Sequence, residues 1–380
     1  MKTKAISLLV TLSAALIAAL CPATAAMAGG NGSTAQPSKT KFEIKRGVNI
    51  AHWVSQTGAR GEERARIFTE RDVEQLAAWG FDHIRIPVGE EQLFSHDGTM
   101  DDETMTLIET AIGWCEKHGM RAIFDLHNLR SHHFNEKNNT LWTSPEAQQR
   151  LCDMWEKIAR RLDKFPVTLL AYELLNEPVA DKNEEWNKVL AKLLPVVRDI
   201  NKKRVILVPS NKWDSVDNIP DVAIPDNDKN IILTFHFYEP FILTHYRASW
   251  TDQKDIVLEH GVKYPGRPVD PEDVAKLDER QQKIVGWWAT QNFDTEWLRA
   301  RWKRAVDFAR RKGLALYLGE FGCLHTVSQE ARVAWTGDIT AMCNEYGIPR
   351  AYWEYKSGFG FADWNTGKLT NPELLKAITQ

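Results

Sequence analysis

Eight short β-rich runs recur along the chain, separated by segments with a helical pattern. They cover residues 47–51, 83–88, 121–127, 169–177, 204–210, 231–238, 315–321 and 349–355. Strands that alternate with helices are typical of a parallel sheet. Eight such units in about 340 residues favour a closed barrel over an open doubly wound sheet, and no GxGxxG follows the first run. The predicted fold class is therefore α/β, a (β/α)8 TIM barrel.

Two of the intervening segments carry clear helix signals. Thr69 is a candidate N-cap, and it precedes an apolar face that ends at Gly80. A second apolar face runs from Leu107 to Gly119. Caps and a 3.6-residue period agree in both segments, so we expect a helix in each.

The first 28 residues have the pattern of a signal peptide. Lys2 and Lys4 precede an apolar run from Ile6 to Leu20, and small residues follow it up to Ala28. The run is shorter than the roughly 20 residues of a comfortable membrane span, and no later segment approaches that length. We therefore expect a signal peptide over residues 1–28, a short flexible linker over 29–40 and the barrel over 41–380. The mature protein is expected to be secreted, extracellular or periplasmic, without a membrane anchor.

The charge balance disfavours nucleic acid as a partner. Loss of residues 1–28 removes two lysines and no acid, which leaves 46 basic side chains against 51 acidic ones. Phosphate binding requires a basic stripe or patch, and none is present. We expect a monomer with no nucleic-acid partner.

Four cysteines remain after cleavage at Ala28: Cys115, Cys152, Cys323 and Cys343. Their spacing is wide and contains no CxxC pair, which disfavours a metal site. Buried free thiols or a single disulfide are the two interpretations that remain, and the spacing does not determine a pairing.

Polar residues gather at the C-terminal ends of the predicted strands. In a barrel these ends meet at one face, where the active sites of this architecture form. Buried polar groups cost free energy unless they are paired, so packing does not explain a set of this size. The set consists of Arg85, His127, Asn176, Glu177, His236, Tyr238, Glu320 and Trp353.

Two members of this set, Glu177 and Glu320, are carboxylic acids on opposite sides of the predicted barrel. Glycoside hydrolysis needs two such groups, one to protonate the leaving oxygen and one to attack the anomeric carbon or to activate water. A separation of about 5–5.5 Å is typical of retention of configuration, and one above about 6.5 Å is typical of inversion. The sequence predicts the pair and leaves the separation open.

The motifs around these acids, LLNEP at residues 174–178 and GEFG at 319–322, resemble the cellulase-type enzymes of glycoside hydrolase family 5. The resemblance covers nearly the whole chain after the signal peptide. It implies a retaining, two-glutamate hydrolysis of β-1,4-glucosidic bonds in cellulose or related β-glucans, without a cofactor. It places the acid/base role on Glu177 and the nucleophile role on Glu320.

The same resemblance implies roles for the neighbouring residues. Arg85 is expected to hydrogen-bond Glu320, to lower the pKa of that carboxyl and to keep it ionised, whereas Glu177 needs a raised pKa to donate a proton. The other expected substrate-binding residues are His127, Asn176, His236, Tyr238 and Trp353. His52 and Trp53, which follow the first strand, are further expected contacts. Alternation along the strands favours structural roles for Glu173 and Glu354.

Fifteen tryptophans are many for a chain of 380 residues. Those in helical patterns are expected to pack in the core, namely Trp79, Trp114, Trp155 and Trp302. Those in predicted rim loops are expected to stack on sugars, namely Trp53, Trp142, Trp213, Trp250 and Trp364.

Several alternatives stay open at the level of sequence. A metal-dependent hydrolase would use Asp125 and His127, although Asn128 and Arg130 interrupt that cluster. A non-catalytic carbohydrate-binding barrel would have no reason to keep both glutamates. Among hydrolases, mannan, β-1,3-glucan and xyloglucan are alternative substrates, because fold and core site do not decide among them. The long connection over residues 239–313 leaves endo and exo action open.

Overall fold

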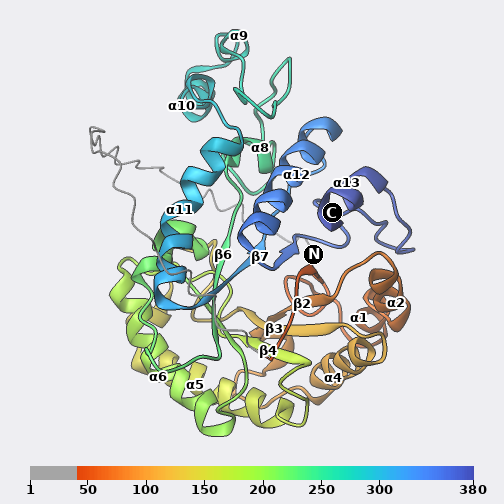
Figure 1. Ribbon diagram of the computed structural model, residues 1–380, viewed down its shortest axis with the longest axis vertical. Coiled ribbons are helices and arrows are strands. Elements are labelled where there is room, and N and C mark those ends of the chain that lie inside the picture. Colours follow the sequence, from red (N-terminus) through yellow and green to blue (C-terminus); the bar gives the residue numbers. More distant parts are fainter. Residues whose placement is uncertain (1–40) are drawn as a thin grey trace, which may run out of the picture.

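The computed structural model describes residues 41–380, and Figure 1 shows them as a barrel of strands enclosed by helices. The expected signal peptide and linker over residues 1–40 lie outside the described residues. Eight parallel strands close in sequence order, which confirms the predicted fold. They are β1 (Arg46–Asn49), β2 (His83–Gly89), β3 (Arg121–Asn128), β4 (Leu170–Glu173), β5 (Ile206–Pro209), β6 (Ile231–His236), β7 (Ala315–Glu320) and β8 (Arg350–Tyr352).

The longer helices lie outside the barrel and between consecutive strands (Figure 1). They are α2 (Glu70–Ala78), α4 (Asp102–Lys117), α5 (Pro145–Leu162), α6 (Asn183–Ile200), α11 (Thr295–Lys312) and α12 (Gln329–Tyr346), and α13 (Pro372–Thr379) ends the chain. Shorter helices are α1 (Gly61–Ile67), α3 (Glu90–Leu93), α7 (Asn211–Asp214), α8 (Phe241–Thr244), α9 (Pro271–Val274) and α10 (Glu279–Val285). Short 3-10 helices are η1 (Thr140–Trp142), η2 (Val216–Asp221) and η3 (Trp288–Thr290). Within residues 41–380, no helix combines the length and apolar character needed to cross a membrane.

Both helices expected from caps and periodicity are present. Helix α2 follows Thr69, whose backbone N–H donates to the Asp72 carboxylate at 2.8 Å. Helix α4 begins at Asp102, ahead of the first apolar residue of the predicted pattern. Its start is set by Asp101, whose carboxylate accepts from the Thr104 N–H at 2.6 Å. A polar first turn therefore precedes the amphipathic part of the helix.

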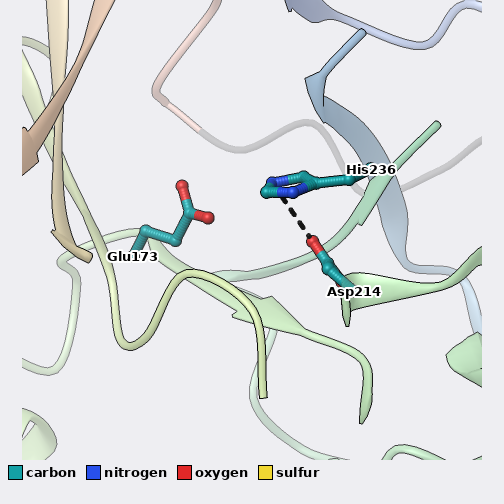
Figure 2. Close-up of side chains that lie close together, drawn as sticks. All are labelled: Glu173, Asp214 and His236. Atoms are coloured by element: carbon teal, nitrogen blue, oxygen red, sulfur yellow. Dashed lines mark ion pairs between the residues drawn. The ribbon is translucent and has the colours of Figure 1, made fainter. Parts of the chain in front are cut away.

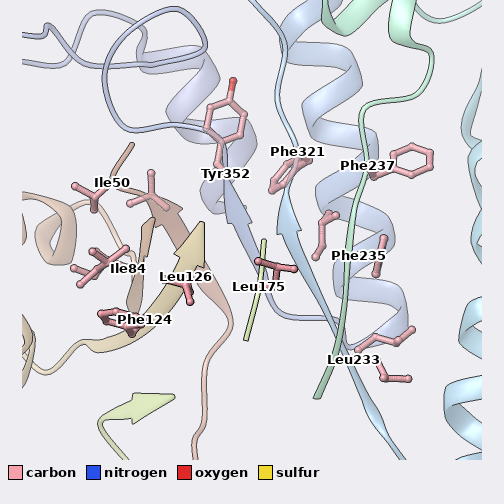
Figure 3. Close-up of a cluster of buried hydrophobic side chains, with 14 of the residues drawn as sticks. Ile50, Ile84, Phe124, Leu126, Leu175, Leu233, Phe235, Phe237, Phe321 and Tyr352 are labelled. Carbon is pink, nitrogen blue, oxygen red and sulfur yellow. The ribbon is translucent and has the colours of Figure 1, made fainter. Parts of the chain in front are cut away.

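Alternate residues of each strand face two separate apolar regions. Side chains such as Ile84, Phe124 and Leu233 point outward and pack with the helices in one large core, part of which Figure 3 shows. Residues of opposite parity, such as Ile123 and Leu207, fill the lower barrel interior. This inner layer also contains the hydrogen bond between His83 and the Tyr317 hydroxyl, at 3.0 Å, and it forms the floor of the site.

The long connection between β6 and β7 carries α8, α9, α10 and η3 before α11 begins. Figure 1 shows α9 and α10 beyond the ring of barrel helices. Because this segment leaves the C-terminal end of β6, its first residues border the face where the polar strand ends meet. The prediction of a long, partly irregular connection is confirmed.

Strand β4 ends at Glu173, earlier than the predicted strand over residues 169–177. Beyond Glu173 the backbone bonds first to β5 and then to β3, through Leu174 N to Leu207 O (3.2 Å) and Asn176 N to Leu126 O (3.2 Å). Regular alternation is lost over this stretch. The chain therefore bends just after β4. This bend is needed for Asn176 and Glu177, which are adjacent in the sequence, to face the site together.

Candidate active site

Arg85 is the central cation of the polar cluster at the C-terminal face of the barrel. Its side chain on β2 is fully buried. Nε and Nη2 donate to the two oxygens of Glu173 at 2.7 and 2.8 Å, and Nη2 also donates to the Asn176 side-chain oxygen at 2.7 Å. Asn49 accepts from Nη1 at 2.9 Å, and an Asp125 oxygen lies 3.0 Å from Nη2. A guanidinium fixed by this many acceptors is a rigid support for any further group that it binds.

Glu320, at the end of β7, has a separate hydrogen-bond donor on each carboxylate oxygen. Arg85 Nη1 donates to Oε1 at 2.8 Å, and the Tyr238 hydroxyl donates to Oε2 at 2.9 Å. The side chain is almost fully buried. Its orientation is therefore set by two donors that arise from β2 and from the end of β6.

Glu177 is held by a different partner. Its Oε1 lies 2.8 Å from Nδ1 of His236, and the same nitrogen is 3.6 Å from Oε2 of Glu320. An oxygen of Glu177, an oxygen of Glu320 and a ring nitrogen of His236 all lie within 4.8 Å of one another. The sequence left the separation of the two carboxyl groups open, and in the structure they lie close together with His236 Nδ1 near both.

The two carboxyl groups differ in their tendency to hold a proton. Burial raises the pKa of Glu177 well above its usual value, and the nearby negative charge of Glu320 raises it further. Burial also raises the pKa of Glu320, while the Arg85 guanidinium is the largest influence in the opposite direction. The expectation of a lowered pKa at Glu320 is therefore wrong in its net direction, because loss of solvation outweighs the cation. The pKa of Glu177 is raised more than the pKa of Glu320, so the proton still favours Glu177 and the negative charge favours Glu320.

His127 and Trp353 form one wall of the site. Their rings stack with centroids 5.7 Å apart and an interplanar angle of 5°. His127 Nδ1 lies 2.7 Å from an Asp125 oxygen, and no hydrogen-bond partner for its Nε2 is found among residues 41–380. Burial lowers the pKa of His127 to about 3, so the ring is neutral and Nε2 is free to bond a ligand hydroxyl.

The expected contact between Trp53 and substrate is wrong. Trp53 has no exposed surface, its Nε1 donates to the Arg64 carbonyl at 3.0 Å, and its ring packs on Phe68. The chain turns inward after β1, so the indole joins the core. His52 is the neighbour that remains accessible, with a side chain that is 33% exposed and lies 3.4 Å from the buried Glu354 carboxylate.

The remaining rim tryptophans divide into two groups. Trp142 is partly buried between His132 and Trp186, which is a packing role rather than the expected stacking role. Trp213, Trp250 and Trp364 are exposed. Trp250 lies near His245, whose ring contacts Tyr238, and Trp364 lies near His52. Trp250 and Trp364 therefore border the site from different loops.

The residues proposed for a metal-dependent hydrolase bond each other instead. One Asp125 oxygen contacts both His127 Nδ1 and the Arg85 guanidinium. A cation between Asp125 and His127 would lie against a fixed positive charge, so this donor set does not fit a metal ion. The four cysteines Cys115, Cys152, Cys323 and Cys343, all within the described part of the chain, are buried free thiols.

Two residues of the cluster were missed by sequence reasoning. Asn49 supports Arg85 from the end of β1 and donates to the Gly319 carbonyl at 3.0 Å. Asp214 is fully buried beneath His236. Asn49 could have been found as a polar strand-end residue in the first predicted strand. Asp214 comes several residues after the end of β5, so the sequence does not mark it as a strand-end residue.

A closed (β/α)8 barrel with two buried glutamates facing each other at its C-terminal end defines the class of barrel glycoside hydrolases. The chain matches the family model described as Cellulase (glycosyl hydrolase family 5) over residues 45–358. It therefore belongs to glycosyl hydrolase family 5 and is a glycoside hydrolase. This confirms the expected family and the expected enzyme class.

Individual relatives agree with this membership. The chain is 32% identical to Endoglucanase C from Acetivibrio thermocellus over 317 residues, which are 82% of this chain and 91% of that protein. It is 29% identical to Cellodextrinase A from Ruminococcus flavefaciens over 311 residues, 81% and 84% of the two chains. A solved endoglucanase superposes with a TM-score of 0.70 at 25% identity and covers 88% of this chain and 97% of its own. Thermotoga maritima Cel5A in complex with cellobiose, at 24% identity, 89% and 97% coverage and a TM-score of 0.71, shows the shared fold.

Proposed function

We propose that this protein hydrolyses β-1,4-glucosidic bonds in cellulose-type β-glucans with retention of configuration, using Glu177 as acid/base and Glu320 as nucleophile. The observation that carries the proposal is that one oxygen of each buried carboxyl group lies within 4.8 Å of an oxygen of the other. Inversion requires about 6.5 Å or more to admit a water molecule between substrate and base. The observed spacing favours direct attack by a carboxylate.

In the first step, Glu177 gives its proton to the glycosidic oxygen as Glu320 attacks the anomeric carbon. The bond to the leaving sugar breaks, and a glycosyl ester forms on Glu320. Arg85 and the Tyr238 hydroxyl orient the attacking carboxylate through its two oxygens. Fixed donors of this kind need no rearrangement during the reaction.

In the second step, Glu177 removes a proton from water, the water oxygen attacks the anomeric carbon, and Glu320 leaves as a carboxylate. Esterification removes the charge on Glu320, which is the largest electrostatic influence that raises the pKa of Glu177. The pKa of Glu177 therefore falls after the first step, and the same residue changes from acid to base.

The substrate-binding part of the proposal rests on His127, Asn176, His236, Tyr238 and Trp353, with His52 in place of Trp53. The free Nε2 of His127 can bond a sugar hydroxyl, and Trp353 offers an apolar edge beside it. The relatives named endoglucanase and cellodextrinase favour β-glucan polymers or oligomers as the substrate. We further propose a secreted monomer that needs no metal or cofactor.

The test of the catalytic pair uses Glu177→Gln and Glu320→Gln with a soluble cellulose derivative. Each variant should lose about 10³-fold or more of kcat/KM, because each removes one half of the acid–nucleophile pair. Glu156→Gln, on the exposed side of α5, is the matched control and should keep full activity. Turnover near the wild-type rate in either Glu177→Gln or Glu320→Gln contradicts the mechanism.

The stereochemistry and the substrate are tested on the wild-type protein. Proton NMR of fresh hydrolysate should show the β-anomer first, and an α-anomer first contradicts retention. A panel of cellulose derivative, barley glucan, laminarin, mannan and xyloglucan, with product lengths recorded, should show the highest rate on β-1,4-glucan. A higher rate on mannan or laminarin contradicts the proposed substrate but not the proposed catalytic pair.

A further inference from the structure

A second carboxyl group lies beneath the acid/base, on the far side of His236. Figure 2 shows Glu173, Asp214 and the His236 ring close together, with an ion pair drawn between Asp214 and the ring. The Asp214 Oδ2 is 3.7 Å from His236 Nε2, while Nδ1 of the same ring is 2.8 Å from Glu177. Atoms of Glu173, Asp214 and His236 all lie within 4.8 Å of one another, and all three residues are buried. His236 thus connects Glu177 to an internal carboxyl group.

The backbone is distorted to place Asp214 there. Lys212, Trp213 and Asp214 have φ values of 57°, 61° and 50° in succession, which non-glycine residues rarely adopt. The run directs Asp214 into the protein, whereas Trp213 is exposed. A strained backbone at a buried polar side chain is a feature of functional sites.

The Asp214 carboxylate receives two hydrogen bonds of its own. The Ser210 backbone N–H donates to Oδ1 at 2.6 Å, and the Thr234 hydroxyl donates to Oδ2. Both bonds favour the ionised form of Asp214. In contrast, His236 Nε2 is buried and has no hydrogen-bond partner of normal length among residues 41–380. Among residues 41–380, the carboxylate within ion-pair distance of this nitrogen is Asp214.

The position of one proton on His236 links the two carboxyl groups. Burial lowers the pKa of His236 well below its usual value, so the ring is neutral and carries a single N–H. When the hydrogen is on Nε2, it points to Asp214, and Nδ1 is an acceptor for a protonated Glu177. When the hydrogen is on Nδ1, it points to Glu177 and favours the ionised carboxylate. An acceptor beside Nε2 therefore selects the arrangement in which Glu177 holds its proton.

We propose that Asp214 is a positioning residue that acts through His236 to keep the proton on Glu177 before the first step. This inference rests on the proposed role of Glu177 as the acid. The direct effect of the Asp214 charge has the same sign, because it raises the pKa of Glu177. Burial raises the pKa of Asp214 itself well above its usual value, and the hydrogen bonds that Ser210 and Thr234 donate to its two oxygens oppose that rise and favour the ionised form.

Other titratable groups face Glu177 from the surrounding strands, and they must stay unchanged in the test. They are Arg85 on β2, Asp125 on β3, His236 and Tyr238 at and just after the end of β6, and Glu320 on β7, and Glu173 on β4 lies beside His236. None of them is altered by a change from carboxylate to amide at residue 214. The substitution therefore isolates the contribution of Asp214.

The variant is Asp214→Asn, which keeps the shape of the side chain. Its oxygen can still accept from Ser210 N–H, and its NH2 group can donate to Thr234 and to His236 Nε2. A donor at Nε2 places the ring hydrogen on Nδ1 and favours ionised Glu177. We expect the basic limb of the kcat/KM profile to move about one unit to lower pH, with kcat reduced about tenfold and KM little changed.

Two controls separate this role from a structural one. Asp226→Asn, on the exposed surface shortly after η2, should leave the pH profile unchanged. Aryl β-cellobiosides with a very acidic phenol need little help from a general acid, so Asp214→Asn should hydrolyse them at nearly the wild-type rate. The proposal is overturned if the basic limb of the kcat/KM profile does not move. It is also overturned if Asp214→Asn loses as much activity on the aryl β-cellobiosides as on β-glucan.

A readout without substrate distinguishes failure of this inference from failure of the proposed function. Long-range ¹H–¹⁵N correlation of histidine-labelled protein reports the tautomer of His236, assigned with His236→Gln. We expect the Nε2–H form in wild type and the Nδ1–H form in Asp214→Asn, whichever glycan is cleaved.

Should Asp214→Asn not fold, Thr234→Val is the second variant. It removes one hydrogen bond that keeps Asp214 ionised, so we expect a smaller shift of the basic limb of the kcat/KM profile in the same direction. The same tautomer in wild type and in the folded variant overturns the proposal.

Discussion

At the scale of single residues, the site is a set of carboxyl groups that differ in their partners. Glu320 has Arg85 and Tyr238, Glu177 has His236, and Glu173 is bound to Arg85 through both oxygens. The same residue type thus has three roles, because a fixed cation, a neutral imidazole and a phenol hydroxyl affect a buried acid differently. The sequence identified the acids by their strand-end positions. It could not reveal the balance between burial and charge, and this is why the pKa direction at Glu320 was wrong.

Tyr238→Phe tests the contribution of one of these partners. The substitution removes the hydroxyl that donates to Glu320 Oε2 at 2.9 Å and keeps the ring. We expect kcat to fall roughly 100-fold, as for the loss of one preorganised donor, with a smaller change in KM. Since that hydrogen bond lowers the pKa of Glu320, its loss should move the acidic limb of the activity profile to higher pH. An unchanged acidic limb and an unchanged kcat would show that Tyr238 does not orient the nucleophile.

At the scale of elements, strand ends were predictable and the turns after them were not. Eight strands and their C-terminal polar residues follow from alternation and order along the chain, and all eight strands are present. The turn after β1 buries Trp53, and the left-handed run after β5 hides Asp214. Both depend on backbone conformations that ordinary residues rarely adopt, and no residue type in the sequence signals them.

Gly319 shows how tightly strand β7 is fitted to its neighbour. A Cβ at this position would lie 2.9 Å from His236 Nε2. We therefore expect Gly319→Ala to displace the imidazole from Glu177, to reduce kcat at least tenfold and to lower Tm. Gly113→Ala is the matched control, because a Cβ there meets nothing within 4 Å and α4 is a regular helix. The control should gain about 0.5–1 kcal/mol in the free energy of unfolding and keep full activity. Wild-type activity in Gly319→Ala would contradict the role given to the His236 position.

At the scale of the whole molecule, many polar and titratable groups are buried in one barrel mouth. Several histidines are held neutral there by burial, and the pKa of His132 is lowered to about 3. In the unfolded chain a histidine takes up its proton near pH 6.5. Between pH 6.5 and about 3 the unfolded state therefore binds one more proton at this residue than the folded state. The free energy of unfolding contributed by His132 must fall as the pH falls through this window.

His132→Gln measures that contribution. Glutamine cannot be protonated in this range, and its oxygen can accept from the Val179 N–H that His132 Nε2 now bonds at 3.3 Å. Between pH 6 and pH 4, the free energy of unfolding should decrease less steeply in the variant than in wild type, by about 1.4 kcal/mol per pH unit. Urea unfolding at several pH values supplies the slopes. Parallel slopes would show that His132 is protonated in the folded state.

The export proposal also concerns the whole chain. Lys2, Lys4 and the apolar run up to Leu20 predict cleavage near Ala28. Expression of the full sequence in a bacterial host should deliver a protein that begins close to residue 29 to the periplasm or the medium, as N-terminal sequencing would show. Retention of residues 1–28 on a cytoplasmic product would contradict the proposal.

The central claim is that Glu320 forms a covalent bond to the sugar while Glu177 serves as the acid/base. The most direct measurement uses a 2-deoxy-2-fluoro-β-cellobioside with a dinitrophenolate leaving group. Fluorine at C2 slows both steps because it destabilises the positively charged transition state, and the reactive leaving group keeps the first step fast enough for the ester to accumulate. Mass spectrometry of the digested protein should then show one fluorocellobiosyl group on the peptide that contains Glu320. A label on Glu177 or on another residue, or no label while the reagent is turned over, would contradict the account.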